Sequence, residues 1–352
     1  MPWPQDPFLP VANTPAPKRR GPLGAIGAGL LFCVATVAVV QFFRPSDSNP
    51  ASPFSRISEA FSPSPAPGTA SPRTDAFGNS HSVNVHFSMP NQDVDFPMDR
   101  NGDAANLQYE WIRFGDSTAA EPPRKLTGAK LVAPPRPGFY HLSVVNGLDR
   151  ELIEQPALGV IVPFDQKVAG RLNGYNIGTY IAERAGRDDH ERPDGFVEVR
   201  PEVLDLQVSK HLKLADFVTH DEQGDVWPKY VVLNRRLLDK LELVMTDLGA
   251  NVRPEMAIDV HSGFRTPQHN ARIPRAAEDS RHQYGDAADI TIDADGDGKI
   301  TQTDELLVML SVERVEGLHP DLVGGLGLYM GKRFPVPYLH IDVRGKRTRW
   351  KG

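Results

Sequence analysis

A long apolar run near the start of the chain limits how that part can fold. Residues 23–43 read LGAIGAGLLFCVATVAVVQFF, without a single charged side chain. A helix rises about 1.5 Å per residue, so the run just spans a hydrocarbon core of about 30 Å. Because a chain inside lipid must satisfy its own backbone hydrogen bonds, a helix is the expected form. The run therefore predicts one transmembrane helix over residues 23–43.

The flanks of this run predict its orientation. Lys18, Arg19 and Arg20 precede it, and the positive-inside rule keeps such a short N-terminus, residues 1–22, in the cytoplasm. We expect an uncleaved, single-pass anchor in the cell inner membrane, with everything after it periplasmic or otherwise extracytoplasmic. A cleaved signal peptide is the alternative, but the apolar run is long and no clear A-x-A site follows it.

Cysteine usage and net charge exclude several classes of site. Cys33 is the single cysteine among 352 residues, so an internal disulfide framework and a cysteine-based zinc site are excluded. The net charge of -6 argues against nucleic acid as the main partner, because phosphate binding needs clustered Lys and Arg. Any bound metal must therefore be held by His, Asp and Glu.

Composition and periodicity divide the rest of the chain into four segments. Residues 44–78 are rich in Pro, Ser and Ala and cannot bury a core, which is typical of a linker. Alternating runs such as SVNVHFSM and FYHLSVV predict an all-β sandwich, Ig-like in the loose sense, over residues 79–165. Residues 166–204 read as a connecting segment of loops and short strands. A helix-period run and several strands in residues 205–352 predict an α+β domain.

The stretch SRHQYGDAADI carries the first indication of chemistry. His282 and Asp289 are seven residues apart, which is too far for both to reach one metal ion from a single helix, but they suit ligands on a loop and on the next strand, with Gly285 allowing a turn. His340, in the alternating run YLHIDV, could supply a third ligand from another strand. Three protein ligands plus a water is the composition of a catalytic zinc site. The pair alone occurs often by chance, so ordinary polar residues remain the alternative.

Three ordered motifs together resemble the zinc D-Ala-D-Ala carboxypeptidases, in the group that also contains the lysostaphin-type and hedgehog-type metal domains. SRHQYGDAAD matches the motif S-x-H-x-x-G-x-A-x-D in full. Upstream, SGFRTPQHN is similar to the family segment SG-aromatic-R-T-P-x-x-N, and VSKHLKLADF resembles the segment that opens the catalytic domain. Downstream, HIDVRGKRTRW resembles the closing His-x-Asp and basic-x-Trp of a periplasmic branch. The resemblance covers about residues 205–352 and implies a domain built on an antiparallel sheet.

This resemblance implies a zinc site and a peptidase activity. His282, Asp289 and His340 would hold Zn²⁺. Arg265 would bind a substrate carboxylate, a role that suits the guanidinium fork, and Ser280 would hydrogen-bond the substrate near the metal. Zinc would polarise the scissile carbonyl and activate water to attack it. The substrates of the family are peptidoglycan stem peptides, cut at a D-amino-acid bond.

The chain departs from the family pattern at the general base. Relatives usually place Glu three residues, or His two residues, before the last ligand, and those positions are Pro337 and Tyr338 here. Neither accepts a proton usefully at neutral pH, since the pKa of Tyr is about 10. Asp342 is the nearest catalytic substitute, although strand alternation puts it on the face of His340, where it could serve only to orient that ligand. His261 is another candidate.

The residues after Asp289 fit the register of an EF-hand calcium loop over residues 293–304. Positions 1, 3 and 5 are Asp, position 6 is the required Gly298, and position 8 is the usual apolar anchor, Ile300. The expected Ca²⁺ ligands are Asp293, Asp295, Asp297, Lys299, Thr301 and Asp304. Aspartate at position 12, where Glu is usual, resembles the dockerin loop. The alternative to a calcium site is a solvated acidic turn before a helix. If calcium binds, its expected role is to hold in place a loop beside the zinc site.

Together these features predict a membrane-anchored zinc peptidase that hydrolyses peptidoglycan stem peptides or cross-links in cell-wall remodelling, as a D,D-carboxypeptidase or endopeptidase. The alternative from another class is a non-catalytic, metal-bound cell-wall binding or scaffolding protein, which the missing base keeps open. A third possibility is a calcium-dependent interaction module in which the sandwich is the working part.

Overall fold

The computed structural model describes residues 83–95, 107–116, 119, 121–126, 130–187, 190–331, 334 and 336–352. The expected transmembrane helix over residues 23–43 and the expected linker over residues 44–78 lie outside these residues. Within the described residues, no helix combines the length and the apolar character needed to cross a membrane.

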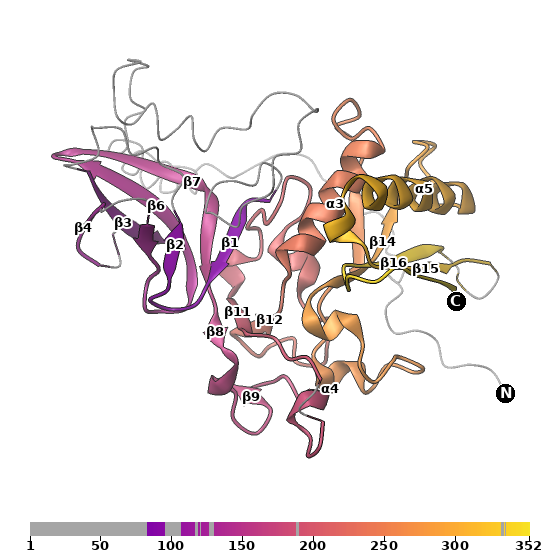
Figure 1. The fold of residues 1–352 in the computed structure, drawn as a ribbon, viewed down its shortest axis with the longest axis horizontal. Coiled ribbons are helices and arrows are strands. Elements are labelled where there is room, and N and C mark those ends of the chain that lie inside the picture. Colours follow the sequence, from indigo (N-terminus) through magenta and orange to yellow (C-terminus); the bar gives the residue numbers. More distant parts are fainter. Residues whose placement is uncertain are drawn as a thin grey trace, which may run out of the picture. The chain divides into compact units, whose positions relative to one another are not determined.

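Two β-sheets form the first described part of the chain (Figure 1). The larger has the order β1-β7-β6-β3-β4, and the smaller pairs β2 with β5. The strands are β1 (Val85–Ser88), β2 (Asp93–Asp95), β3 (Gln108–Arg113), β4 (Arg124–Lys125), β5 (Lys130–Val132), β6 (Gly138–Asn146) and β7 (Asp149–Val160). Val94 and Leu131 of the smaller sheet share a buried apolar cluster with Leu142 and Leu158 of the larger. The two sheets thus share a core, and the Ig-like assignment stays a prediction.

The expected connecting segment contains short strands and single helical turns. Within residues 166–204 lie β9 (Arg171–Leu172), β10 (Tyr175–Asn176), β11 (Gly195–Val199) and the 3-10 turns η3 (Ile181–Glu183) and η4 (Pro201–Val203). Just before them come β8 (Val162–Pro163) and the 3-10 turn η2 (Phe164–Gln166), and after them come the 3-10 turn η5 (Leu214–Phe217) and β12 (Lys229–Val231). Tyr180 belongs to an aromatic cluster that also holds Tyr284, and its hydroxyl donates to the backbone carbonyl of Gln283 at 3.0 Å. This segment therefore packs against the part of the chain that carries His282.

A five-stranded sheet organises the C-terminal part. Its order is β13-β14-β16-β15-β17, and its strands are β13 (Ile258–Ser262), β14 (Ala287–Ile292), β15 (Gly325–Tyr329), β16 (Tyr338–Asp342) and β17 (Thr348–Lys351). Four of the five strands pair antiparallel to their neighbours, as the sequence resemblance implies. The last strand, β17, instead runs parallel to β15. Mixed sheets with few helices give an α+β fold.

The two long described helices begin at side-chain caps. The helices are α3 (Arg235–Asp247), α4 (Pro267–Asn270) and α5 (Gln302–Leu318), with 3-10 turns η6 (Arg281–Tyr284) and η7 (Pro320–Leu322). Asn234 accepts a hydrogen bond from the backbone N–H of Arg236 at the start of α3, and Thr301 accepts from Thr303 at the start of α5. Gly249, with a φ of +94°, follows α3 in a backbone conformation that other residues rarely adopt.

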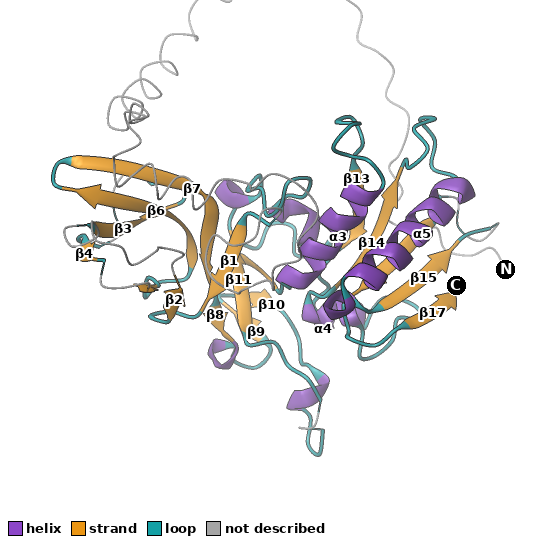
Figure 2. Ribbon diagram, turned by 45° about the horizontal axis from the view of Figure 1, so that its top comes forward, coloured by secondary structure: helices purple, strands orange, loops and turns teal. Residues whose placement is uncertain are grey.

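Helices α3 and α5 cover one face of the C-terminal sheet (Figure 2). Leu241 of α3 and Val312 of α5 belong to the same buried cluster as Ile290 of β14 and Ile341 of β16. Because side chains alternate along a strand, the residues next to Ile290 and Ile341 point to the opposite face. The helices therefore leave the other face of β14 and β16 free to carry polar side chains.

Candidate metal centre

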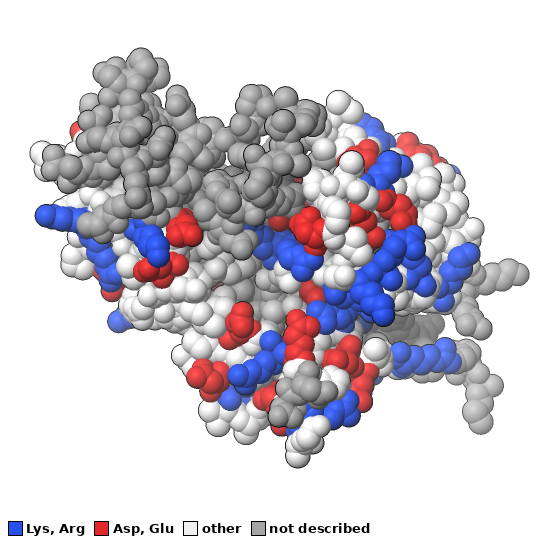
Figure 3. Space-filling view, in the orientation of Figure 1, with Lys and Arg blue, Asp and Glu red and all other residues white. Residues whose placement is uncertain are grey.

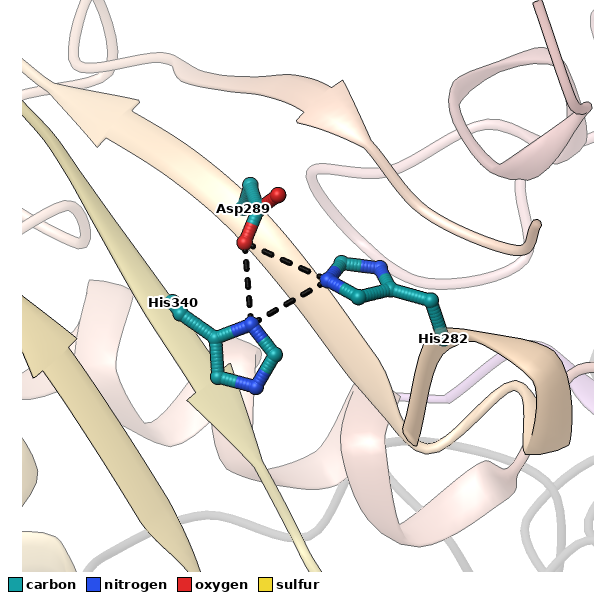
Figure 4. A group of neighbouring side chains, drawn as sticks. All are labelled: His282, Asp289 and His340. Carbon is teal, nitrogen blue, oxygen red and sulfur yellow. Dashed lines mark hydrogen bonds and ion pairs between the residues drawn. The ribbon is translucent and has the colours of Figure 1, made fainter. Parts of the chain in front are cut away.

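Strand pairing and a tight turn bring together the three residues that the sequence suggested as metal ligands. Asp289 of β14 and His340 of β16 are directly opposed in the antiparallel register. His282 lies in η6, and the chain then turns at Gly285, with a φ of +64°, to enter β14. A Cβ at Gly285 would lie 2.1 Å from the carbonyl oxygen of Val232, so only glycine fits. One ligand atom from each of the three residues lies within 4.8 Å of the others (Figure 4).

The hydrogen bonds of the two histidines show which ring nitrogens face inward. Nδ1–H of His282 donates to the carbonyl of Gly263 at 2.7 Å, and Nε2–H of His340 donates to Asp342 at 3.2 Å. The opposite atoms, Nε2 of His282 and Nδ1 of His340, are 3.1 Å apart, and Oδ1 of Asp289 lies 2.9 Å from the latter. Two imidazole nitrogens and one carboxylate oxygen fit a zinc ion with an open fourth position. Outer hydrogen bonds of this kind fix the tautomer and orientation of metal-binding histidines.

Burial and neighbouring charge act together on these groups. Burial lowers the pKa of His282, which favours the neutral imidazole that binds metal. Burial opposes ionisation of Asp289, but His282, His340 and Arg265 outweigh it and hold the pKa of that carboxyl well below its usual range. In His340 burial is likewise outweighed, by Asp289 and Asp342, and the pKa of the ring is raised. A carboxylate is thus kept ionised in a buried site, as a metal ligand must be.

Arg265, which was expected to bind a substrate carboxylate, lies against Asp289, one of the expected metal ligands. Its Nη2 forms an ion pair with Oδ2 of Asp289, and its Nε donates to the hydroxyl of Ser262 at 2.7 Å. The Arg265 side chain is 16% exposed. Oδ2 of Asp289 is therefore neutralised by Arg265, while Oδ1 points to the two histidines. In this position Arg265 orients Asp289 as a one-oxygen ligand.

Ser280 occupies the position before η6, and its backbone carbonyl accepts from the N–H of Gln283 at 3.0 Å. It is buried, with 9% of its surface exposed. The structure therefore places Ser280 two residues from His282, at the start of the turn that presents that ligand.

Asp342, the expected substitute for the base, lies behind His340. Its carboxylate accepts from Nε2 of His340, from the backbone N–H of Gly325 at 2.6 Å and from Nε of Arg344 at 2.9 and 3.0 Å. It is fully buried. Because it binds the nitrogen of His340 that points away from Asp289 and His282, it is placed to orient the ligand.

The position two residues before His340 is part of an aromatic stack. Tyr338 lies parallel to Tyr329 with ring centroids 4.6 Å apart, and the ring of His261 lies at 6.2 Å from Tyr338 at an angle of 22°. Nε2 of His261 is 3.2 Å from the hydroxyl of Thr291. His261 thus lies beside Thr291 and Tyr338, which are two residues along their strands from Asp289 and His340.

Sequence reasoning did not assign a role to Trp350 or Gly327. The Trp350 ring lies 5.2 Å from the ring of His340, at an angle of 49°. Gly327 is paired with His340 on one side and with Trp350 on the other, and a Cβ there would lie 2.4–2.6 Å from the indole. The missing side chain lets the indole reach across β15 to the ligand. The available signal was the closing segment HIDVRGKRTRW, which ends on Trp350, but the contact of Trp350 with His340 depends on the order of the strands in the sheet.

Three of the six expected calcium residues come together in the loop before α5. Asp293, Asp295 and Asp297 each offer one carboxylate oxygen, and these oxygens lie within 4.8 Å of one another. Asp293 accepts from the backbone N–H of Gly298 at 2.8 Å, and Asp297 accepts from that of Lys299 at 2.8 Å. The backbone is therefore wrapped around the carboxylates, an arrangement open both to a calcium loop and to an acidic turn.

Two of the other expected calcium residues, Thr301 and Asp304, take part in capping α5. Thr301 is the N-cap residue, and Oδ2 of Asp304 accepts from its backbone N–H at 2.8 Å. Oδ1 of Asp304 accepts from the N–H of Ala294 at 2.8 Å and from that of Asp295 at 3.1 Å. Asp304 is buried, and both of its oxygens are engaged by the protein. Its carboxylate is not part of the group formed by the carboxylates of Asp293, Asp295 and Asp297.

Comparison with known proteins gives one match. Residues 210–311 match the family model described as Peptidase M15. The matched part contains Arg265, His282 and Asp289 and ends before His340. No curated protein and no solved structure matches the chain. The match, together with the His-Asp-His group, supports a zinc-dependent metallopeptidase activity.

Proposed function

We propose that this protein hydrolyses peptidoglycan stem peptides or cross-links in a zinc-dependent reaction, as a D,D-carboxypeptidase or endopeptidase in cell-wall remodelling. The observation that carries the proposal is the convergence of Nε2 of His282, Oδ1 of Asp289 and Nδ1 of His340 within a part of the chain that largely matches Peptidase M15. The peptidoglycan substrate is supported by the resemblance of SRHQYGDAAD and SGFRTPQHN to D-Ala-D-Ala carboxypeptidase motifs.

The residues around the site have separate tasks in this proposal. His282, Asp289 and His340 hold the metal. Zinc held by these three residues would supply a Lewis acid and would lower the pKa of a bound water to about 7. Arg265 keeps Oδ2 of Asp289 neutralised, so that the carboxylate presents one oxygen to the site. Asp342 holds His340 through Nε2, and we assign it this orienting role in place of the base.

A non-catalytic cell-wall binding or scaffolding protein is the second candidate. The specific observation that favours it is the aromatic stack at Tyr338, which occupies a position where relatives place a proton acceptor. Such a protein would keep the metal-bound fold and bind the peptide without cutting it.

Digestion of purified peptidoglycan by the full-length chain in detergent separates the two candidates. Mass spectrometry is expected to show release of D-Ala or cleavage of a cross-link, lost with a chelator and restored by zinc. His282→Ala should bind no zinc and give no product, whereas His141→Ala, in β6 of the first part, should match wild type. Stoichiometric zinc in wild type without any product would favour the binder, and stoichiometric zinc in His282→Ala would contradict the ligand assignment.

We also propose that the loop of residues 293–304 binds Ca²⁺. Support comes from the grouping of three aspartates and from two glycines, Gly296 and Gly298, whose φ values are +78° and +80°. Calcium is expected to raise the thermal midpoint of the full-length chain. Asp297→Ala should remove that response, whereas Asp205→Ala, at a side chain that is 90% exposed outside the loop, should keep it. An equal calcium response in Asp297→Ala would contradict the site.

We propose a membrane-anchored location, with the metal centre outside the cytoplasm. The apolar run of residues 23–43 supports the anchor. We expect the protein to bind peptidoglycan and not nucleic acid. On the face shown in Figure 3, Lys and Arg lie intermixed with Asp and Glu, unlike the one-sign surface typical of nucleic-acid binding. Recovery of the full-length chain in the soluble fraction after an alkaline membrane wash would contradict the anchor.

A further inference from the structure

Lys240 is a fully buried charged residue on α3, on the helix-covered side of the C-terminal sheet. Its Nζ donates to Oε1 of Glu316 on α5 at 2.7 Å and to the backbone carbonyl of Asp342 on β16 at 2.8 Å. The Glu316 side chain is 4% exposed. One ammonium group thus joins two helices to the strand that carries His340 and Asp342.

Two glycines close this contact into a ring of hydrogen bonds. The N–H of Gly324 donates to Oε1 of Glu316 at 3.1 Å, and the N–H of Gly325 donates to Oδ1 of Asp342 at 2.6 Å. A Cβ at Gly324 would lie 1.9 Å from the Asp342 carbonyl oxygen, and one at Gly325 would lie 2.2 Å from its Oδ2. Only glycine at these two positions allows the backbone of β15 and of the residue before it to lie so close to Asp342. The ring therefore holds Asp342 by its backbone carbonyl, through Lys240, and by its carboxylate, through Gly325.

Stability alone is a weak reason for a charge at this position. Taking an ammonium and a carboxylate out of water costs several kcal/mol per ion, and apolar residues of similar volume often do as well or better. Burial accordingly lowers the pKa of Lys240 against the opposing effect of Glu316. What an apolar residue cannot do is donate to a strand carbonyl at a fixed point. That carbonyl belongs to the residue whose carboxylate holds Nε2 of His340.

We propose that Lys240 is a positioning residue of the metal centre. Together with Glu316 it fixes Asp342, which in turn holds the His340 ring with Nδ1 directed at Asp289 and His282. The inference rests on the zinc centre of the proposed function but not on its substrate. Residues two steps removed from the metal therefore set its affinity and the geometry of its ligands.

Zinc affinity and the Co²⁺ absorption spectrum of the full-length chain test this proposal without any activity assay. Lys240→Met leaves Glu316 buried with less compensation, so the paired variant Lys240→Met/Glu316→Leu, which removes both charges, is measured beside it. Competition with a chromogenic chelator is expected to show zinc binding about 10- to 100-fold weaker than wild type in each folded variant. The visible bands of bound Co²⁺ should shift, because the His340 ligand is reoriented. With Asp342→Asn already present, adding Lys240→Met should weaken zinc binding little further.

Lys229→Met is the matched control, since Lys229 is also buried but donates to the carbonyl of Gln223, away from the ligands. It should alter unfolding of the metal-free chain while leaving zinc affinity and the Co²⁺ bands as in wild type. Wild-type zinc affinity and spectrum in the paired variant would overturn the inference. Wild-type chain that binds no zinc would overturn the proposed centre itself, so the two failures are told apart.

Discussion

At the scale of single residues, burial alone does not decide the state of a histidine. Burial lowers the pKa of His282, and no partner reverses this. In His340 the carboxylates of Asp289 and Asp342 outweigh burial and raise the pKa. In His141 of β6, whose Nδ1 lies 2.9 Å from the carbonyl oxygen of Glu154, burial outweighs both that carbonyl and the charge of Glu154 and lowers the pKa from 6.5. The neighbours contributed by other strands therefore set the behaviour of each ring.

His141 gives a pH-dependent prediction away from the metal. Because its pKa is lowered in the folded chain, the unfolded chain binds more protons at and below the ordinary value of 6.5, and stability falls as the pH drops. His141→Gln should lessen the fall in unfolding free energy between about pH 7.5 and about pH 5.5. Urea unfolding of the metal-free chain at several pH values measures this slope. An unchanged or steeper slope in the variant would count against the assignment.

At the scale of elements, two glycines of β15 leave room for side chains of the neighbouring strands. Its glycines alternate on the face of the metal centre: Gly325 makes room for the Asp342 carboxylate, and Gly327 makes room for the indole of Trp350. Glycine in a strand interior weakens the strand and often marks close approach of another group. Here the groups that approach are the two that contact His340 from outside the ligand set.

Gly327→Ala should destabilise the protein by about 1–3 kcal/mol, because the added methyl group overlaps the Trp350 ring. Displacing the indole should also weaken zinc binding, since the ring packs against His340. Urea unfolding and chelator competition measure the two effects. Gly317→Ala is the control: its Cβ would meet nothing within 4 Å on α5, and alanine should stabilise that helix by about 0.5–1 kcal/mol. Wild-type stability and zinc affinity in Gly327→Ala would contradict the inference that Gly327 is needed to place the Trp350 ring against His340.

At the scale of the whole described molecule, one apolar cluster crosses the boundary predicted from the sequence at residue 205. It contains Val83 and Phe139 from the first part together with Val208, Leu241 and Ile341 from the C-terminal part. The backbone N–H of Asn84 also donates to the carbonyl of Val208 at 2.9 Å. Residues that share one apolar core are expected to unfold together.

Thermal unfolding of the full-length chain is therefore expected to be one cooperative transition for the described parts. Calorimetry and tryptophan fluorescence should give coincident midpoints, since tryptophans lie both in β3 and in β17. Zinc should raise this single midpoint, because it binds only the folded chain. A separate, zinc-insensitive transition at lower temperature would show that the first part unfolds alone.

The sequence by itself determined the features that depend on near neighbours. Residue types at His282, Gly285 and Asp289 define a ligand, a turn and a second ligand within one short stretch, and helix caps and apolar periods locate α3 and α5. These patterns are local, so they can be recognised without knowing which strands pair. The choice of His340 as third ligand needed the family resemblance as well, since 51 residues separate it from Asp289.

Only the tertiary structure decided which atoms meet. The tertiary fold aims Nε2 of His282, from η6, and Nδ1 of His340, from β16, at Oδ1 of Asp289, and it turns Arg265 onto Oδ2 of the same carboxylate. It also places Asp342 behind His340, over Lys240 of α3. Such contacts join residues far apart in the chain, and a shift of one residue in the pairing of β14 and β16 would turn each side chain to the opposite face. The sequence therefore names the candidate ligands, whereas the tertiary structure sets their geometry.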